Sequence, residues 1–277
     1  MKRAVKALNR ISVQQLAFSY NGRDMVFENF SAEFSGGPTA IIGQNGAGKT
    51  TLVKLIKGLL KPDKGRILIN GIPAGSMTVR DLAKTVGLVF QNPNDQIFKP
   101  SVLEEVTFGP KIIGFSGEKA ERSAKEALEM LGISHLKHEN PYDLNLSQRK
   151  LVSIASILSM DPDILIFDEP TMGQDYEGRE IIKRTIRHLR ERGKLVLAIL
   201  HDMDFVAENF DRAVVMHEGK IIADGHPREV FAREEIVAQA GLELPNAVKL
   251  GKRLGLKDIF LTKNELIRYL KERTSGR

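Results

Sequence analysis

The residues best suited to chemistry form the segment Gly43-Gln-Asn-Gly-Ala-Gly-Lys-Thr50, which fits the pattern G-x-x-x-x-G-K-[ST]. An apolar run precedes it and a helical pattern follows it. In that context glycines let consecutive backbone N–H groups turn inward, and the helix adds the positive end of its dipole, so an anion is the natural occupant. The segment therefore predicts a phosphate-binding loop for a nucleotide, formed by Gly43, Gln44, Asn45, Gly46, Ala47, Gly48, Lys49, Thr50 and Thr51.

Two further groups of side chains follow buried-looking strands. Asp168 and Glu169 end the apolar run 163–167, where Asp168 can hold Mg²⁺ together with the Thr50 hydroxyl and Glu169 can activate water as a general base. Gln91 follows the run 86–90 and can touch both Mg²⁺ and that water; His201 follows the run 195–200 and can hold the γ-phosphate. The competing interpretation is that these are polar strand ends and a structural histidine.

The surrounding pattern predicts an α/β protein. Residues 11–20 and 26–34 alternate apolar and polar, as antiparallel strands do, and Asn21-Gly22 supplies a turn between them. The runs 39–42, 65–70, 86–90, 163–167, 195–200 and 213–216 predict further strands, several of them central and covered on both faces. The span from about 92 to 160 predicts a helical insert without strands. Helices resume beyond about 233, with a predicted capping box at Thr262 and Glu265.

Composition indicates a cytosolic protein. No apolar run approaches the roughly 18 residues that cross a bilayer, the chain lacks cysteine, and its basic start lacks the apolar stretch of a signal peptide. Net charge is +6, and residues 249–277 alone hold nine Lys/Arg against three Asp/Glu, also +6. The basic excess therefore belongs to the C-terminal end, as a solvated helix face or a patch for an anionic partner.

In order and spacing, these motifs resemble the ATPase subunits of ATP-binding cassette (ABC) transporters over residues 11–232, and the stretches 90–98 and 104–110 resemble the ATPases of energy-coupling factor importers. The resemblance implies a RecA-like P-loop NTPase core with N-terminal antiparallel strands, a helical subdomain at about 92–160 and a C-terminal dimerisation extension at 233–277. It implies that Tyr20 stacks on adenine, Gln91 couples, Glu169 is the catalytic base and His201 the switch histidine. ATP and Mg²⁺ are the implied ligands.

The signature segment, residues 144–148, departs from that family. The usual Leu-Ser-Gly-Gly-Gln grips the nucleotide of the opposite subunit; here it reads Leu144-Asn145-Leu146-Ser147-Gln148. Asp175 is kept, but the usual leucine before it is replaced by Gln174. The intact elements that act in cis, paired with an altered signature, predict a heterodimer with a second, related ATPase. The alternative is that Asn145 and Ser147, as polar helix-start residues, substitute adequately in a homodimer.

The expected function is ATP hydrolysis that powers uptake of a vitamin or transition-metal ion. The expected partners are the second ATPase, a transmembrane coupling subunit docked where Gln91 meets the helical insert and, indirectly, a substrate-binding membrane subunit. The chain would then lie on the cytoplasmic face of the membrane. An ABC ATPase acting on nucleic acid or ribosomes is the chief alternative, but a single cassette with its charge at one end makes nucleic acid unexpected. A GTPase is disfavoured because no Asn-Lys-x-Asp motif is present.

Overall fold

A mostly parallel sheet organises the part of the chain that the computed structural model describes, residues 9–275. Its strand order is β10-β9-β3-β8-β7-β6, and only β9 and β10 pair antiparallel. The strands are β3 (Thr39–Ile42), β6 (Val86–Val89), β7 (Ile164–Asp168), β8 (Leu195–Ile199), β9 (Arg212–His217) and β10 (Lys220–Gly225). Every residue of β3, β6, β7 and β8 is buried, which explains why these strands are apolar except for Thr39 at the start of β3 and Asp168 at the end of β7.

A second, antiparallel sheet has the order β2-β1-β4-β5. Its strands are β1 (Arg10–Ser19), β2 (Met25–Ser35), β4 (Lys64–Ile69) and β5 (Ile72–Pro73). Asn21 shapes the predicted turn between the first two, because its side-chain oxygen accepts from the backbone N–H groups of Arg23 and Asp24, each at 2.9 Å. The short strand β5 and the partly exposed β10 were not predicted from the sequence.

The parallel sheet separates two apolar cores. On one face, alternate strand residues such as Ile41, Ile166 and Leu197 pack with the antiparallel sheet and with α1 (Lys49–Ile56). On the other face, residues such as Ile42, Phe167 and Ala198 pack with helices. These helices include α5 (Leu146–Leu158), α6 (Tyr176–Glu191) and α7 (Met203–Asn209). The catalytic candidates at the strand ends therefore rest on a base that is buried on both sides.

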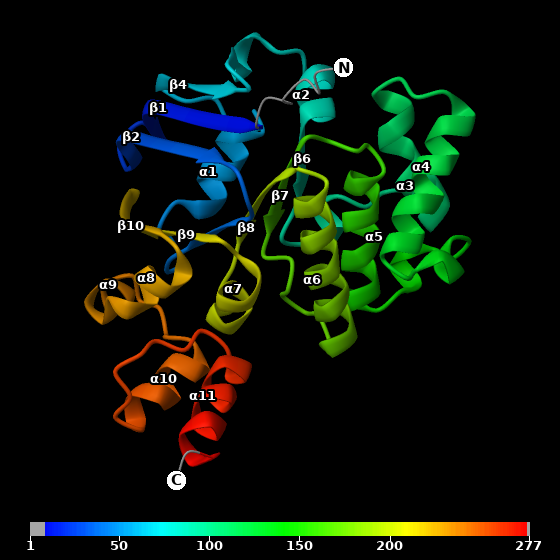
Figure 1. The fold of residues 1–277 in the computed structure, drawn as a ribbon. Coiled ribbons are helices and arrows are strands. Elements are labelled where there is room, and N and C mark those ends of the chain that lie inside the picture. The colour runs from blue at the N-terminus through cyan, green and yellow to red at the C-terminus, as the bar shows by residue number, and fades with distance from the viewer. Residues whose placement is uncertain (1–8, 276–277) are drawn as a thin grey trace, which may run out of the picture.

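Residues 92–160 contain helices and no strand, as predicted. They carry α3 (Val102–Ile112), α4 (Gly117–Met130) and α5, with 3₁₀ turns at Pro93–Asp95, Ser134–Leu136 and Pro141–Asp143. A further 3₁₀ turn, Ala74–Ser76, and helix α2 (Val79–Thr85) precede β6. In Figure 1, α3 and α4 form one side of the molecule, and α5 lies between them and the parallel sheet. The start of α5 is the signature segment, so this helix connects the insert to the core.

The C-terminal helices are α8 (Pro227–Ala232), α9 (Glu234–Gln239), α10 (Asn246–Arg253) and α11 (Lys263–Ser275). In Figure 1, α10 and α11 project away from α3 and α4. Ala247, Phe260 and Leu266 form a small apolar cluster of their own. The predicted capping box is only half present: Thr262 accepts from the Glu265 N–H at 3.2 Å, but the Glu265 carboxylate accepts instead from Leu261 N–H at 2.8 Å and from Arg228. Among residues 9–275, no helix is long and apolar enough to span a membrane.

Candidate functional site

The phosphate-binding loop connects β3 to α1, and two of its glycines cannot be replaced by a residue with a side chain without strain. Gly43 has φ 151°, and a Cβ there would lie 2.1 Å from the carbonyl oxygen of Met216. Gly48 has φ 96°, and a Cβ there would lie 2.9 Å from the Phe27 ring. Any side chain at these positions would be strained and would clash. The glycine pattern that marked the loop in the sequence is therefore demanded by its local packing.

Lys49 spans this loop. Its ammonium donates to the carbonyl oxygens of Gly43 at 2.7 Å and Gln44 at 2.9 Å, and the residue is buried. Burial lowers the pKa of Lys49, while the nearby carboxylates of Glu169 and Asp168 oppose that shift. The cation is thereby held inside the loop, where the phosphates of a nucleotide would need it.

An open cavity of about 510 Å³ lies over the loop, lined by Tyr20, Val26, Asn45, Gly46, Gly48, Lys49, Thr50, Thr51, Gln91 and Glu169. The Tyr20 hydroxyl is 3.1 Å from the Thr51 hydroxyl, and Phe18 meets the Tyr20 ring edge to face. Tyr20 remains 62% exposed. These contacts fix the orientation of an aromatic ring that stays accessible for stacking.

Two of the predicted magnesium ligands, Thr50 and Gln91, line this cavity, and the third, Asp168, lies next to Thr50. Thr50 Oγ1 donates to Asp168 Oδ1 at 3.4 Å, and Asp168 is buried at the end of β7. Burial is the main cause that raises the pKa of Asp168; the hydrogen bond from Thr50 opposes it. A hydroxyl, a carboxylate and the amide oxygen of Gln91 are the hard oxygen donors that Mg²⁺ prefers, so the residues fit the ion.

The three predicted catalytic side chains meet at one carboxylate. Glu169 Oε1 lies 3.0 Å from His201 Nε2, and Glu169 Oε2 accepts from Gln91 Nε2 at 3.1 Å. The strand ends that carry them are adjacent in the sheet, because β7 pairs with both β6 and β8. Glu169 also has φ +49°, a strained conformation for a non-glycine residue and one that often occurs at functional sites. Both carboxylate oxygens are thus oriented by neighbouring side chains of this chain.

Lys150 is a site residue that sequence reasoning missed. Its ammonium donates to the carbonyl oxygens of Phe90 and Gln91, both at 2.7 Å, and of Asp168 at 3.4 Å. Burial lowers the pKa of Lys150 to about 8. The only signal in the sequence was a lysine that comes directly before the apolar residues Leu151 and Val152 in a predicted helix. Lys150 ties α5 to the two strand ends that carry Gln91 and Asp168.

The signature residues form a second group. Asn145 caps α5 by accepting from Gln148 N–H at 2.9 Å, and Gln148 Oε1 accepts from Asn145 N–H at 3.3 Å. Asp175 caps α6 by accepting from the N–H of Gly178 at 2.7 Å, and Ser147 Oγ lies 3.5 Å from the Asp175 carboxylate. None of these residues lines the cavity over the phosphate-binding loop. The structure therefore brings together the residues predicted to act on this chain's own nucleotide and leaves those predicted to act on the partner's nucleotide outside that cavity.

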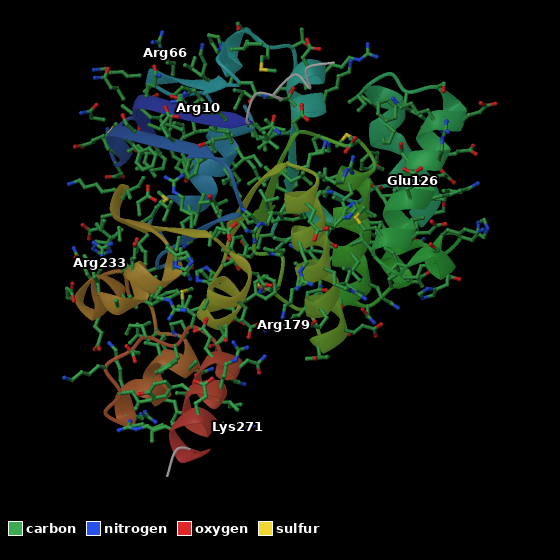
Figure 2. The ribbon with its side chains drawn as sticks, in the orientation of Figure 1. Arg10, Arg66, Glu126, Arg179, Arg233 and Lys271 are labelled. Atoms are coloured by element: carbon green, nitrogen blue, oxygen red, sulfur yellow. The ribbon has the colours of Figure 1, made fainter. Side chains whose placement is uncertain are left out.

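A second cavity, of about 610 Å³, continues past Glu169 and His201 to Arg179 and Asp202. Arg179, on α6 and labelled in Figure 2, forms an ion pair with Asp202, the residue that caps α7. This pair connects the helix that follows Asp175 to the helix that follows His201. Asp202, the residue after His201, is thus held both by Arg179 on α6 and by the start of α7.

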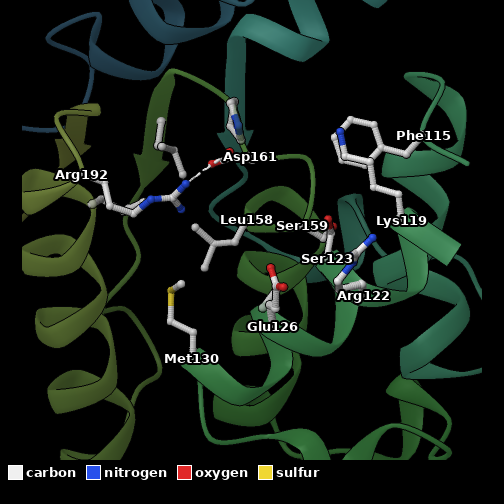
Figure 3. A pocket seen from close by; sticks show the side chains of 14 residues that line it. Phe115, Lys119, Arg122, Ser123, Glu126, Met130, Leu158, Ser159, Asp161 and Arg192 are labelled. Carbon is white, nitrogen blue, oxygen red and sulfur yellow. Dashed lines mark hydrogen bonds and ion pairs between the residues drawn. The ribbon is translucent and has the colours of Figure 1, made fainter. Parts of the chain in front are cut away.

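A third cavity, of about 460 Å³, lies elsewhere, between α4 and the ends of α5 and α6 (Figure 3). Asp161 and Arg192 form an ion pair on its wall at 3.1 Å. Asp161 precedes β7, so this cavity lies at the end of the strand opposite to Asp168. It holds both cations and carboxylates, including Lys119 and Glu126. Position and mixed charge both separate it from the nucleotide site.

The C-terminal helices contact the site directly, which the sequence did not reveal. The backbone N–H of Gln44 in the phosphate-binding loop donates to the carbonyl of Ala240 at 3.1 Å. Asn246 N–H donates to the carboxylate of Asp204, three residues after His201, at 2.7 Å. Residues beyond α8 are therefore bonded to the phosphate-binding loop and to α7, the helix that follows His201.

Residues 27–172 match the ABC transporter family. The chain is 37% identical to the energy-coupling factor transporter ATP-binding protein EcfA of Methanocaldococcus jannaschii, over 95% of this chain and 99% of that protein. It is 36% identical to EcfA2 of Caldanaerobacter subterraneus, over 94% and 98% of the two chains. The solved structure of cbiO1 from Clostridium perfringens, part of the ABC transporter complex cbiONQ, superposes with a TM-score of 0.74 at 34% identity, over 89% and 98%. A dimeric ATP-binding cassette with ADP and phosphate superposes with a TM-score of 0.71 at 26% identity, over 79% and 99%. These structures confirm the predicted α/β fold class of a P-loop NTPase.

Proposed function

Because the chain belongs to the ATP-binding subunits of ABC transporters, which bind and hydrolyse ATP, we propose that it powers an energy-coupling factor importer for a vitamin or transition-metal ion. The observation that carries the proposal is the Glu169 carboxylate, held by Gln91 and His201 beside a complete phosphate-binding loop. Copurification of intact membrane complexes with this chain as bait tests it. Recovery of a transmembrane coupling subunit and a substrate-binding membrane subunit is expected, and recovery of ribosomes or nucleic acid alone would contradict it.

Each residue of the site has its own role in the proposed reaction. The loop amides and Lys49 bind the phosphates of ATP, and Tyr20 stacks on adenine. Thr50, Asp168 and Gln91 would hold Mg²⁺, which when bound neutralises phosphate charge. Glu169 accepts a proton from the attacking water, and Gln91 and His201 keep its two oxygens oriented. His201 also lies close enough to Glu169 to hold the γ-phosphate beside the base.

A membrane partner would dock where the loop after Gln91 enters the helical insert. Phe98 is 55% exposed there, meets Phe108 edge to face at 4.9 Å, and has the Lys99 ammonium beside it. The buried carboxylate of Glu105 accepts from the N–H groups of Phe98 and Lys99, both at 2.9 Å. An exposed aromatic ring on a loop held in this way suits a stable protein contact, and it would place the chain on the cytoplasmic face of the membrane.

The second proposed partner is a related ATPase with an intact signature. Asn145 and Gln148 use their polar groups to cap their own helix, and Leu146 is half exposed at the position where a glycine usually lets the backbone approach phosphate. We therefore expect the purified chain alone to hydrolyse ATP at least about tenfold more slowly than its mixture with the related subunit, since electrostatic donors of this kind contribute about 10²-fold or more.

Phosphate release under matched protein concentrations measures this difference. The matched variant is Asn145→Ser with Leu146→Gly, which should raise the rate of the chain alone if the altered signature limits it. A robust rate for the chain alone that this variant leaves unchanged would refute the asymmetric dimer and favour a homodimer.

The proposed C-terminal extension, residues 233–277, supplies a dimer contact. Of the apolar residues in its helices, Ala247 and Leu266 are buried within the chain itself, whereas Leu250, Leu254 and Ile267 remain about half exposed. Replacing Leu250 and Leu254 by Glu should convert an ATP-free dimer into monomers, because charges would enter an apolar contact. Light scattering measures the mass, and Val79→Glu, on an exposed residue of α2, is the control. An unchanged dimer, or DNA binding that these substitutions abolish, would favour the nucleic-acid alternative.

A further inference from the structure

Two departures from the family pattern are in direct contact. Ser147 stands where the signature usually has its second glycine, and Gln174 stands where a leucine usually precedes the aspartate. In the structure, Ser147 Oγ donates to Gln174 Oε1 at 3.2 Å, and Gln174 Nε2 donates to the backbone carbonyl of Ser147 at 3.2 Å. A glycine and a leucine could make neither side-chain bond. The two substitutions are therefore chemically complementary rather than independent losses.

Gly178 provides the room for this contact. It is buried in the first turn of α6, although glycine is, after proline, the residue least favourable to a helix. A Cβ at Gly178 would lie 2.2 Å from Gln174 Oε1 and 2.9 Å from Ser147 Oγ. Alanine would therefore displace Gln174 from Ser147. This packing explains a glycine that the helix itself does not need.

An apolar contact lies beside the polar one. Leu146, the residue before Ser147, covers Gly173, the residue before Gln174: a Cβ at Gly173 would lie 2.7 Å from Leu146 Cδ2. Gly173 has φ +72°, so a side chain there would also strain the backbone. The start of α5 and the loop 172–175 thus meet through the two hydrogen bonds between Ser147 and Gln174, a longer one from Ser147 Oγ to Asp175 Oδ1 at 3.5 Å, and the packing of Leu146 beside Gly173.

We infer that Ser147, Gln174 and Gly178 form a rigid contact, here called the joint, through which the start of α5 and the loop 172–175 move as one body. Through this contact, Gln174 is a positioning residue for the γ-phosphate of ATP bound by the second ATPase subunit. The role toward that nucleotide rests on the proposed function; the joint itself is a property of this chain alone. The joint holds Asp175 and the capped start of α5 at a fixed separation. The altered signature therefore remains an ordered surface, although it binds phosphate poorly.

Hydrogen exchange on the purified chain tests the joint. The reporters are the amides at positions 148 and 149, at the start of α5, and at positions 178 and 179, at the start of α6, all of which are hydrogen-bonded. Gln174→Leu and Gly178→Ala should each speed exchange at both helix starts by about tenfold, since each disrupts two coupled hydrogen bonds. The double variant should show no further increase over Gln174→Leu. Gly117→Ala is the matched control, because Gly117 also lies in a first helical turn but has open space around it.

Exchange that rises only in α6, or at neither helix start, would overturn the joint. The second arm measures ATP hydrolysis by the complex with the related subunit. Gln174→Leu should change that rate at least about threefold, and Ser147→Ala, which removes only one of the two bonds, should change it less. A coupled exchange result with an unchanged rate would overturn the positioning role of Gln174 alone. A complex that does not assemble even with the unmutated chain would instead count against the proposed function.

Discussion

Replacing Glu169 by glutamine will leave ATP binding intact and lower turnover by about 10²-fold or more, the range for loss of a positioned general base. Glutamine keeps the shape of the side chain and can still contact Gln91 and His201, but it cannot take the proton of the attacking water. Equilibrium nucleotide binding and steady-state phosphate release by the assembled complex measure the two quantities separately.

Glu218→Gln is the control for this substitution. Glu218 shares the left-handed backbone of Glu169, with φ +44°, but its side chain is 80% exposed. It lies outside the two cavities at the phosphate-binding loop. Its replacement should leave turnover unchanged. If complexes carrying Glu169→Gln hydrolyse ATP at the unmutated rate, another residue is the base.

Lys49→Ala will have a different effect, weakening ATP binding by about 10²-fold, as expected for removal of a buried cation that would contact phosphate. The carbonyl groups of Gly43 and Gln44, which the ammonium now contacts, would be left facing the phosphates without a cation between them. Titration with a fluorescent ATP analogue measures the affinity.

Lys61→Ala removes a lysine beyond α1 and serves as the control for lost positive charge. An affinity that falls equally in both variants would mean that Lys49 acts only through overall charge. Together, the two variants separate chemistry from binding, because Glu169→Gln is expected to lower turnover with ATP binding intact, whereas Lys49→Ala is expected to weaken binding itself.

The sequence was sufficient for those parts of the site that local rules determine. The phosphate-binding loop was predictable because Gly43 and Gly48 occupy backbone conformations that other residues rarely adopt. Gln91, Glu169 and His201 could be grouped because each follows an apolar run, and the carboxyl ends of neighbouring parallel strands meet at one edge of a sheet. The convergence of two of these side chains on the two oxygens of one carboxylate required the structure.

Contacts between segments far apart in the sequence could not be predicted from the sequence. Lys150 has acceptors about sixty residues earlier in the chain, so its burial among three carbonyl groups could not be inferred from its own helix. The signature and the loop before Asp175 appeared as two unrelated departures, and only their spatial proximity shows Ser147 and Gln174 to be partners. Strand β10 was missed because its partly exposed residues do not form a continuous apolar run.

The hydrogen bond from Gln44 to Ala240 means that the phosphate-binding loop is supported by a residue beyond position 232, so the catalytic core cannot be cut at that position without losing a contact. A chain shortened to that point would lose the acceptor for an amide of the phosphate-binding loop, and with it Gly241, where a Cβ would lie 3.0 Å from the Gln44 side chain. Such a chain could lose activity and dimerisation together for two unrelated reasons. An extension transplanted between related ATPases would therefore have to carry residues 233–241 with the core it came from, and the portion from α10 onward would have to keep the contact between Asn246 and Asp204.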